Sequence, residues 1–168
     1  MPTNNKKPSN PDLSALLEGL VAADIEFILV GGLAAVIQGA PVTTMDVDIV
    51  HCRSAQNIGK LYAFLKSVGA FYRRMDDVII APKTEDLSGT GHVLLTTRLG
   101  PLDVLAVIED GNTYEDLIEH TVEIEFRDHP MRVLDLEMLI KLKKSAKDPN
   151  DKQRLPVLEE TLRQLEKK

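Results

Sequence analysis

The sequence predicts a mixed α/β fold, because stretches with helical periodicity alternate with short apolar strands along most of the chain. The length of 168 residues is that of one ordinary domain. A composition of 43% hydrophobic and 27% charged residues supports a packed core and excludes a disordered or collagen-like chain. We therefore expect a flexible tail over residues 1–10 and a single domain over residues 11–168, with neighbouring strands partly antiparallel.

Apolar periodicity and capping residues predict three helices in the first part of the chain, over residues 11–23, 33–38 and 54–68. Short apolar runs predict strands over residues 26–30 and 47–50. The first of these strands ends at the pair Gly31-Gly32, which indicates a tight turn into the next helix.

The second part of the chain continues this alternation. Strands are expected over residues 78–80, 92–96, 102–108 and 122–126, and residues 82–91 form a long loop rich in turn formers. Helices are expected over residues 114–120, 135–145 and 151–166.

The charge is unevenly distributed along the chain. The net charge is −6, which argues against a protein that coats nucleic acids in general. Residues 141–168 nevertheless carry nine Lys and Arg against five Asp and Glu. This basic end is either a solvated helical surface or a local site for a phosphate-bearing ligand.

Several features predict a cytoplasmic protein without a membrane segment. The longest apolar run, over residues 27–37, is broken by glycines and is shorter than the roughly 20 residues that span a bilayer. No apolar stretch follows the lysines of the first ten residues, so we expect no secretory signal. The single cysteine, Cys52, excludes an internal disulfide, as is typical of a reducing compartment.

Three carboxylates stand at positions where charge is costly. Asp46 and Asp48 lie two residues apart at the beginning of an expected strand, so their side chains point to the same side of the sheet. Asp103 lies within an otherwise apolar strand. Like charges repel, and a lone buried carboxylate is strongly destabilised or stays protonated, so a divalent cation is the natural counter-charge. Mg²⁺ suits these oxygen ligands best, which makes the three residues candidate ligands of one or two Mg²⁺ ions.

The spacing also fits a purely structural arrangement, in which Asp46 and Asp48 end a strand in water and Asp103 pairs with an arginine such as Arg98. The glycine pair favours the chemical alternative, because it lets a ligand approach the backbone where a helix begins. A phosphate-binding turn followed by carboxylates on two later strands is what metal-assisted phosphoryl or nucleotidyl transfer requires.

The stretch FILVGGLAAVIQGAPVTTMDVDIV, residues 27–50, resembles the signature of the nucleotidyltransferase superfamily related to DNA polymerase beta. More narrowly, it is similar to the bacterial AbiEii-like branch, whose members read approximately G-G-x-A, then H-G, then R-x-T-x-D-x-D. The matching residues are Gly31, Gly32, Ala34, Gly39, Thr44, Asp46 and Asp48. The resemblance continues through residues 101–117, where Asp103 takes the third carboxylate position, and ends in the C-terminal helices.

This resemblance implies a minimal nucleotidyltransferase fold, with a mixed twisted sheet, helices mainly on one face and two C-terminal helices. It implies a Mg²⁺-dependent enzyme that moves a nucleotidyl group from an NTP to an acceptor hydroxyl on RNA or protein. It also suggests the toxin half of a toxin–antitoxin or phage-defence pair, with a cognate antitoxin as partner.

Residue roles follow from the same resemblance. The catalytic metal ligands would be Asp46, Asp48 and Asp103, the last of which either holds a second metal or accepts the proton of the acceptor. The nucleotide would be bound by Gly31, Gly32, Thr44 and Lys143, although most of the lysines around position 143 are expected on a solvated helical face.

Three positions depart from the family pattern. Gln38 replaces the usual His, Val42 stands where many relatives have Arg, and Gly32 stands where active polymerase-beta-like enzymes commonly have Ser. Val42 and Gly32 offer no side-chain donor to a phosphate. The sequence therefore leaves a second possibility open, a catalytically inactive binding or antitoxin-like module with the same fold.

The pair Arg73-Arg74, ahead of Asp76-Asp77, predicts a charged turn, with binding of the acceptor as the alternative.

Overall fold

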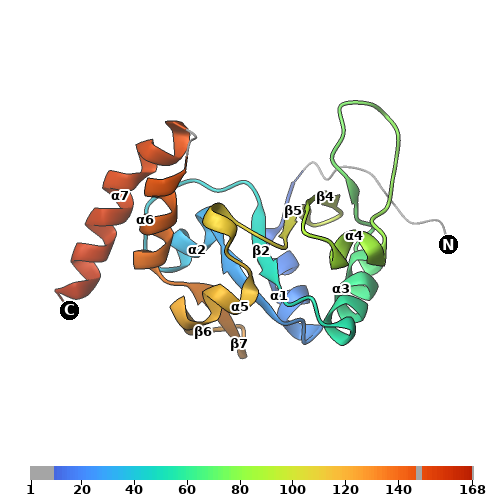
Figure 1. Ribbon diagram of the computed structural model, residues 1–168, viewed down its shortest axis with the longest axis horizontal. Coiled ribbons are helices and arrows are strands. Elements are labelled where there is room, and N and C mark those ends of the chain that lie inside the picture. Colours follow the sequence, from blue (N-terminus) through green and yellow to red (C-terminus); the bar gives the residue numbers. More distant parts are fainter. Residues whose placement is uncertain (1–9, 147–148, 168) are drawn as a thin grey trace.

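The computed structural model describes residues 10–146 and 149–167. Its strands are β1 (Phe27–Val30), β2 (Val47–His51), β3 (Phe71–Tyr72), β4 (His92–Thr97), β5 (Gly100–Leu105), β6 (Thr121–Phe126) and β7 (His129–Leu134). They form a seven-stranded sheet in the order β3-β4-β5-β2-β1-β7-β6 (Figure 1). The pairs β1–β7 and β2–β5 are parallel and the others antiparallel, so the mixed sheet expected from the sequence is confirmed.

Helices alternate with these strands and close the chain. They are α1 (Leu13–Ala22), α2 (Gly31–Ile37), α3 (Ala55–Ser67), α4 (Thr84–Ser88), α5 (Tyr114–Leu117), α6 (Leu136–Ser145) and α7 (Pro149–Glu166), with short 3₁₀ segments η1 (Glu109–Gly111) and η2 (Ile118–His120). The two C-terminal helices, α6 and α7, pack side by side at one end of the molecule (Figure 1). The α/β fold class is thus as expected, whereas the predicted tail over residues 1–10 lies, apart from Asn10, outside the described residues.

Three of the helices, α1, α3 and α6, begin next to a residue whose side chain caps the helix. The carboxylate of Asp12 accepts a hydrogen bond from the backbone N–H of Ala15 (3.0 Å) and so caps α1. The hydroxyl of Ser54 caps α3, and the carboxylate of Asp135 caps α6 by accepting from the N–H of Met138 (2.8 Å). These caps satisfy amide groups that have no partner within the helix, which is why the predicted starts lie within two residues of the observed ones.

The prediction of a strand over residues 78–80 is wrong. Val78 and Ile79 are 51% and 49% exposed and lie in an irregular loop, where Ile80 contributes only its carbonyl to the N–H of Tyr72 (2.9 Å). The partner of β4 is instead β3, and part of the loop expected over residues 82–91 is α4. An apolar β-branched run does not make a strand unless it has a neighbour to pair with and a surface to cover.

Strand β7 has no counterpart among the predicted elements. It contains Pro130, which argues against a strand because proline cannot donate to the sheet. It forms a hairpin with β6 through Arg127 and Asp128, which both have positive φ (48° and 68°), as a tight hairpin turn requires. Its parallel pairing with β1 completes the sheet beside α2.

Asn57 joins α3 to the sheet. Its side chain is 3% exposed, accepts a hydrogen bond from the N–H of Glu26 (2.7 Å), and donates to the carbonyls of Glu26 (2.9 Å) and Cys52 (2.6 Å). The amide therefore fixes the entry to β1 and the exit from β2. These two strands carry the residues considered below.

Substitution Asn57→Ala is expected to lower the free energy of unfolding by about 1–3 kcal/mol, because it removes the side-chain partner of the N–H of Glu26 and of the carbonyl of Cys52. Denaturant unfolding measures the loss. Gln56→Ala, at an exposed position of the same helix, is the control and should change stability by no more than about 0.5 kcal/mol. Equal losses in the two variants would contradict this role.

None of the helices in the described part of the chain is long and apolar enough to cross a bilayer.

Candidate active site

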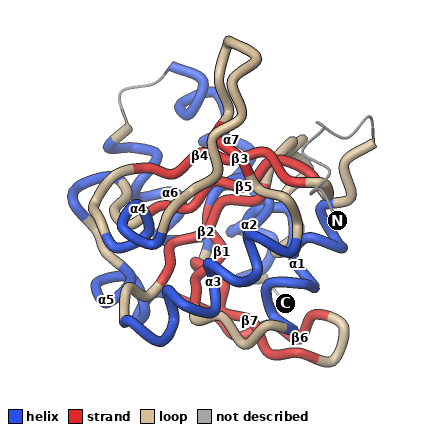
Figure 2. The backbone as a smooth tube through the Cα atoms, turned by 90° about the vertical axis from the view of Figure 1, so that its right-hand side faces the viewer, coloured by secondary structure: helices blue, strands red, loops and turns tan. Residues whose placement is uncertain are grey.

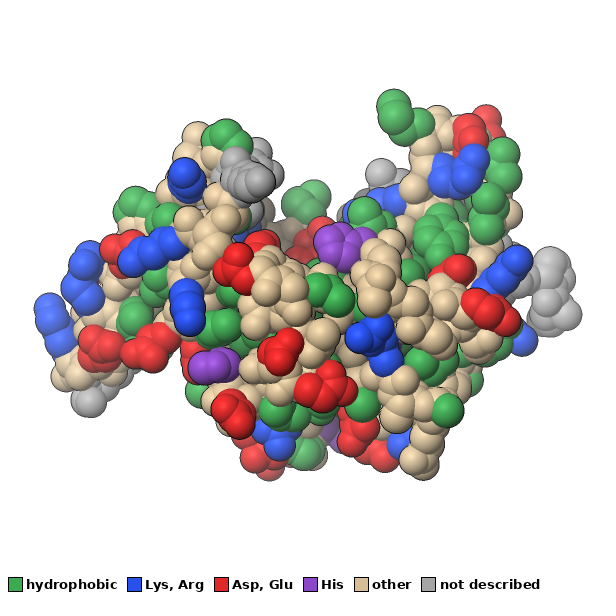
Figure 3. All heavy atoms as spheres, viewed as in Figure 1, with side chains coloured by type: hydrophobic (Ala, Val, Ile, Leu, Met, Phe, Trp, Pro, Cys, Tyr) green, Lys and Arg blue, Asp and Glu red, His purple; other side chains and the backbone are tan. Residues whose placement is uncertain are grey.

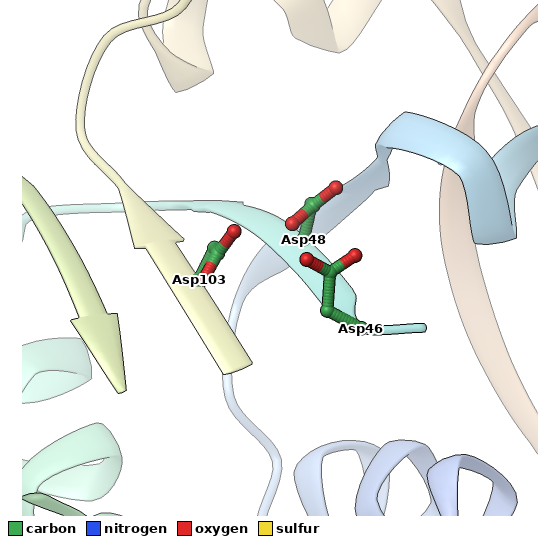
Figure 4. Close-up of side chains that lie close together, drawn as sticks. All are labelled: Asp46, Asp48 and Asp103. Carbon is green, nitrogen blue, oxygen red and sulfur yellow. The ribbon is translucent and has the colours of Figure 1, made fainter. Parts of the chain in front are cut away.

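The sheet brings the three predicted carboxylates together. Asp48 and Asp103 are directly paired in the parallel register of β2 and β5, and Asp46 lies just before β2 (Figure 4). One carboxylate oxygen of each residue lies within 4.8 Å of the others. Because two ligands on opposite sides of a Mg²⁺ ion are about 4 Å apart, only a small adjustment separates this cluster from a shared cation site.

Burial and mutual repulsion raise the pKa of two of these carboxyls. The pKa of Asp48 rises from 3.8 to about 8, first because burial removes water and second because it shares a hydrogen bond with Asp103, with the charge of Asp46 adding to the effect. The pKa of Asp46 is also raised, mainly by burial and then by the charge of Asp103. The cluster therefore holds a proton near neutral pH when no cation neutralises it.

One oxygen of this cluster has no hydrogen-bond partner among the described residues. Oδ1 of Asp48 is buried without one. A buried acceptor without a donor is unfavourable, and a hard cation is a suitable ligand for a carboxylate oxygen. The donor set and this oxygen both fit Mg²⁺.

The arginine that pairs with Asp103 is Arg73. A guanidinium nitrogen of Arg73 contacts Oδ1 of Asp103, and Nε donates to the carbonyl of Leu95 (3.2 Å). Arg98, which the sequence suggested for a structural arrangement of Asp103, instead donates to the carbonyl of Ser67 (2.7 Å). Arg73 thus belongs to the carboxylate cluster, whereas the sequence predicted a charged turn there, with binding of the acceptor as the alternative.

The glycine pair lies inside α2, not before it. Gly31 has a φ of +74°, and a Cβ at this position would collide with Oδ2 of Asp48 and lie 3.0 Å from its Cγ. Glycine is therefore required here twice, by the backbone conformation and by the approach of the carboxylate. The helix consequently begins two residues before the expected Leu33.

Gly32 faces a second group of side chains. A Cβ on Gly32 would lie 3.1 Å from Oγ1 of Thr44 and 3.2 Å from Nη1 of Arg154, which comes from α7. Nη2 of Arg154 donates to the carbonyl of Thr43 (3.1 Å), and the hydroxyl of Thr44 donates to the carbonyl of Asp46 (3.2 Å). The missing side chain at position 32 leaves room for these groups.

A cavity of about 850 Å³ joins these features. The surface is hollowed there, between the C-terminal helices α6 and α7 and the part of the sheet that contains β4 and β5 (Figure 3). Its lining includes Gly31, Gly32, Thr44, Asp46, Asp48 and Lys143. Asp103 is not a lining residue, but it is paired with Asp48 across β2 and β5. The structure therefore brings the other expected site residues to one cavity, with Asp103 beside Asp48. The size is that of a pocket for a nucleotide-sized ligand.

Arg154 also lines the cavity, and sequence reasoning missed it. It lies 111 positions from Thr43, whose carbonyl it contacts, and no local pattern relates the two. The excess of basic residues after position 140 was the one signal for it. Its charge opposes the rise in the pKa of Asp46 that burial and Asp103 cause, so it is electrostatically part of the carboxylate site.

Gln38, a departure from the family pattern, has a structural role. Its side-chain amide donates to the carbonyls of Ala34 (3.0 Å) and Leu134 (2.8 Å), and it therefore ties the end of α2 to the end of β7. Val42 packs against the hydrophobic core.

No protein-family model matches the chain, and no curated protein matches it. Among solved structures, the fold is similar to that of the lincosamide antibiotic adenylyltransferase LnuA with lincomycin bound, with a TM-score of 0.58 and 16% identity over 92% of this chain and 98% of that one. It is also similar to ANT(2")-Ia in complex with adenylyl-2"-tobramycin, with a TM-score of 0.55 and 15% identity over 89% of this chain and 88% of the other.

An antigenic nucleotidyltransferase-like protein from Paracoccidioides brasiliensis aligns with a TM-score of 0.51 and 18% identity, over 87% of this chain and 72% of its own. These similarities show that the chain has the minimal nucleotidyltransferase fold.

The raised pKa of Asp48 predicts how the metal-free protein responds to pH. A carboxyl whose pKa is higher in the folded state than in the unfolded state stabilises the fold below its unfolded pKa of 3.8. That contribution is lost as the pH rises through about 8. In the presence of a chelator, the melting temperature should therefore fall as the pH is raised from about 5 to about 9, and Asp48→Asn should weaken this fall.

Melting curves of the wild type, Asp48→Asn and the control Asp24→Asn test this prediction. Asp24 is an exposed carboxylate paired with Lys60, so its variant should keep the pH dependence of the wild type. An unchanged pH dependence in Asp48→Asn would contradict the assignment.

Proposed function

We propose that this chain is a Mg²⁺-dependent nucleotidyltransferase that transfers a nucleotidyl group from an NTP to an acceptor hydroxyl on RNA or protein. The observation that supports it best is the convergence of Asp46, Asp48 and Asp103 beside a cavity that is also lined by glycines and cationic side chains. Carboxylates alone would repel a triphosphate. The combination with Lys143 and Arg154 suits a polyphosphate that arrives with a divalent cation.

In this proposal one group of residues binds the metal and another binds the phosphates. Asp46, Asp48 and Asp103 would hold Mg²⁺, which when bound polarises the phosphate oxygens and offsets their charge. Gly31 and Gly32 would meet the phosphates through their backbone, which lines the cavity. Their missing side chains let Asp48 and Arg154 come close to this backbone, so the phosphates would lie between carboxylates on one side and cations on the other.

Lys143 and Arg154 would bind the outer phosphates from the C-terminal helices. A guanidinium offers donors in a fixed planar array that suits phosphate oxygens, and the ammonium acts as a point charge. Arg154 approaches the glycine turn near Gly32, where the chain lacks the serine and arginine donors of active relatives. This approach favours an active enzyme over a catalytically inactive module.

The biological role rests on the resemblance to the AbiEii-like branch. It supports a cytoplasmic toxin of a toxin–antitoxin or phage-defence pair, with a cognate antitoxin as partner. The similar structures named above hold lincomycin and adenylyl-2"-tobramycin, so small hydroxylated molecules belong among the acceptors to be tested.

Transfer of labelled nucleotide tests the activity directly. We expect the wild type to label cellular RNA or protein with one of the four NTPs in the presence of Mg²⁺. Asp46→Asn should reduce the rate by about two orders of magnitude or more, because it weakens charge stabilisation at the phosphate. Asp128→Asn, in the β6–β7 turn where φ is positive, is the matched control and should retain activity.

If no NTP gives transfer to RNA, protein or small hydroxylated acceptors, the proposed nucleotidyltransferase activity is rejected. Nucleotide binding without transfer would then favour the inactive module.

A second prediction concerns Arg154. Arg154→Gln should raise the dissociation constant of an NTP by about tenfold or more, because a charge-assisted hydrogen bond to phosphate contributes roughly 1.5–3 kcal/mol. Isothermal titration measures the effect. Arg163→Gln, which alters an exposed pair with Glu160 on the same helix, should leave the affinity unchanged. Equal affinities in all three proteins would remove Arg154 from the site.

A further inference from the structure

Arg73 stands at the point where an irregular loop leaves the sheet. The residues that follow β3 run outward and return where the carbonyl of Ile80 accepts from the N–H of Tyr72 (2.9 Å). The projecting loop between them is visible at the upper right of Figure 1 and at the top of Figure 2. We call residues 73–80 the projecting loop.

Arg73 connects this loop to the carboxylate cluster. The backbone N–H of Arg73 donates to the carbonyl of Leu94 (3.0 Å), and its side-chain Nε donates to the carbonyl of Leu95 (3.2 Å); both acceptors lie on β4. The guanidinium then extends past β4 to Oδ1 of Asp103, which is paired with Leu94 across the two strands. Arg73 is therefore held in one direction by three contacts.

Asp103 also lies beside another carboxylate. It is paired with Asp48 across β2 and β5, so the guanidinium of Arg73 contacts a cluster of like charges. The charge of Arg73 reaches the other two carboxyls as well, because it opposes the rise in the pKa of both Asp46 and Asp48. Arg73 thus supplies the positive charge that the cluster needs in the absence of a cation.

A divalent cation and this guanidinium compete for the same carboxylate, Asp103. If both stayed in place, two like charges would lie within a few ångströms of each other in a partly buried site, which is strongly unfavourable. We infer that Arg73 is a gate on cation binding: it occupies Asp103 in the metal-free protein, and its displacement by the cation releases the base of the projecting loop.

This inference rests on the proposed function, because it requires the carboxylates to bind a divalent cation. It goes further in one respect. Loading of the site with metal becomes coupled to the order of a loop that carries the exposed side chains Met75, Val78 and Ile79. Binding that shifts a two-state element in this way is the physical basis of coupling between sites.

The neighbouring arginine provides a matched control. Arg74 donates through Nε and Nη2 to the two carboxylate oxygens of Asp76 (2.8 and 2.7 Å), within the loop and away from the cluster. Replacement of either arginine by glutamine removes one positive charge from the same loop. Only replacement of Arg73 alters the carboxylate site.

Titration of Mn²⁺ and Mg²⁺ into nucleotide-free protein tests the gate. Arg73→Gln should bind the cation about tenfold more tightly than the wild type, in the range typical of coupling between two sites. Arg73→Lys retains the charge and should stay closer to the wild type, and Arg74→Gln should match it. In chelator we expect Arg73→Gln to melt at a lower temperature than Arg74→Gln, because only Arg73→Gln leaves the carboxylates without their counter-charge.

Hydrogen exchange of the projecting loop gives an independent readout. Cation should speed exchange of the amides over residues 74–80 in the wild type, and these amides should already exchange fast in metal-free Arg73→Gln. Equal cation affinity in the wild type and Arg73→Gln would overturn the gate while leaving the proposed function intact. Loop exchange that does not respond to cation would overturn the release of the loop. Failure of every variant to bind a cation would overturn both the gate and the proposed function.

Discussion

The pairing of Asp48 with Asp103 across two parallel strands is the constraint on which this site depends. Hydrogen bonding between β2 and β5 fixes the two carboxyls side by side, and the alternation of side chains along β2 brings Asp46 to the same face. The sheet cannot relax this repulsion without losing its register. Charge compensation must therefore come from outside the strands, through a proton, an arginine or a cation.

The same carboxylate dictates the turn that precedes α2. Oδ2 of Asp48 lies where a side chain at position 31 would begin, so only glycine is compatible with the ionisable group opposite it. The glycine turn and the D-x-D motif are consequently one structural unit, although 13 residues (33–45) separate them in the sequence. A substitution at either position would disturb the other, which explains in physical terms why the two motifs occur together.

Sequence reasoning succeeded where the cause of a structure is local. The helix starts at Asp12 and Asp135 follow from capping side chains, and the common orientation of Asp46 and Asp48 follows from the period of a strand. It failed where the cause is a distant neighbour. The apolar run at residues 78–80 has no strand to pair with, and β7 forms in spite of Pro130 because β1 and β6 accept it on both sides.

The positions of Arg73 and Arg154 could not be predicted for the same reason. Each reaches the carboxylate site from an element whose approach is set by tertiary packing, the projecting loop in one case and α7 in the other. The anionic part of the site is thus built into the rigid centre of the sheet, and the cationic part comes from its periphery. Such a division lets the balance of charge change when peripheral elements move, without any change in the strands. It also explains how a chain that lacks side-chain donors at Gly32 and Val42 can still present a guanidinium beside the glycine turn, because the donor can be supplied from a different element.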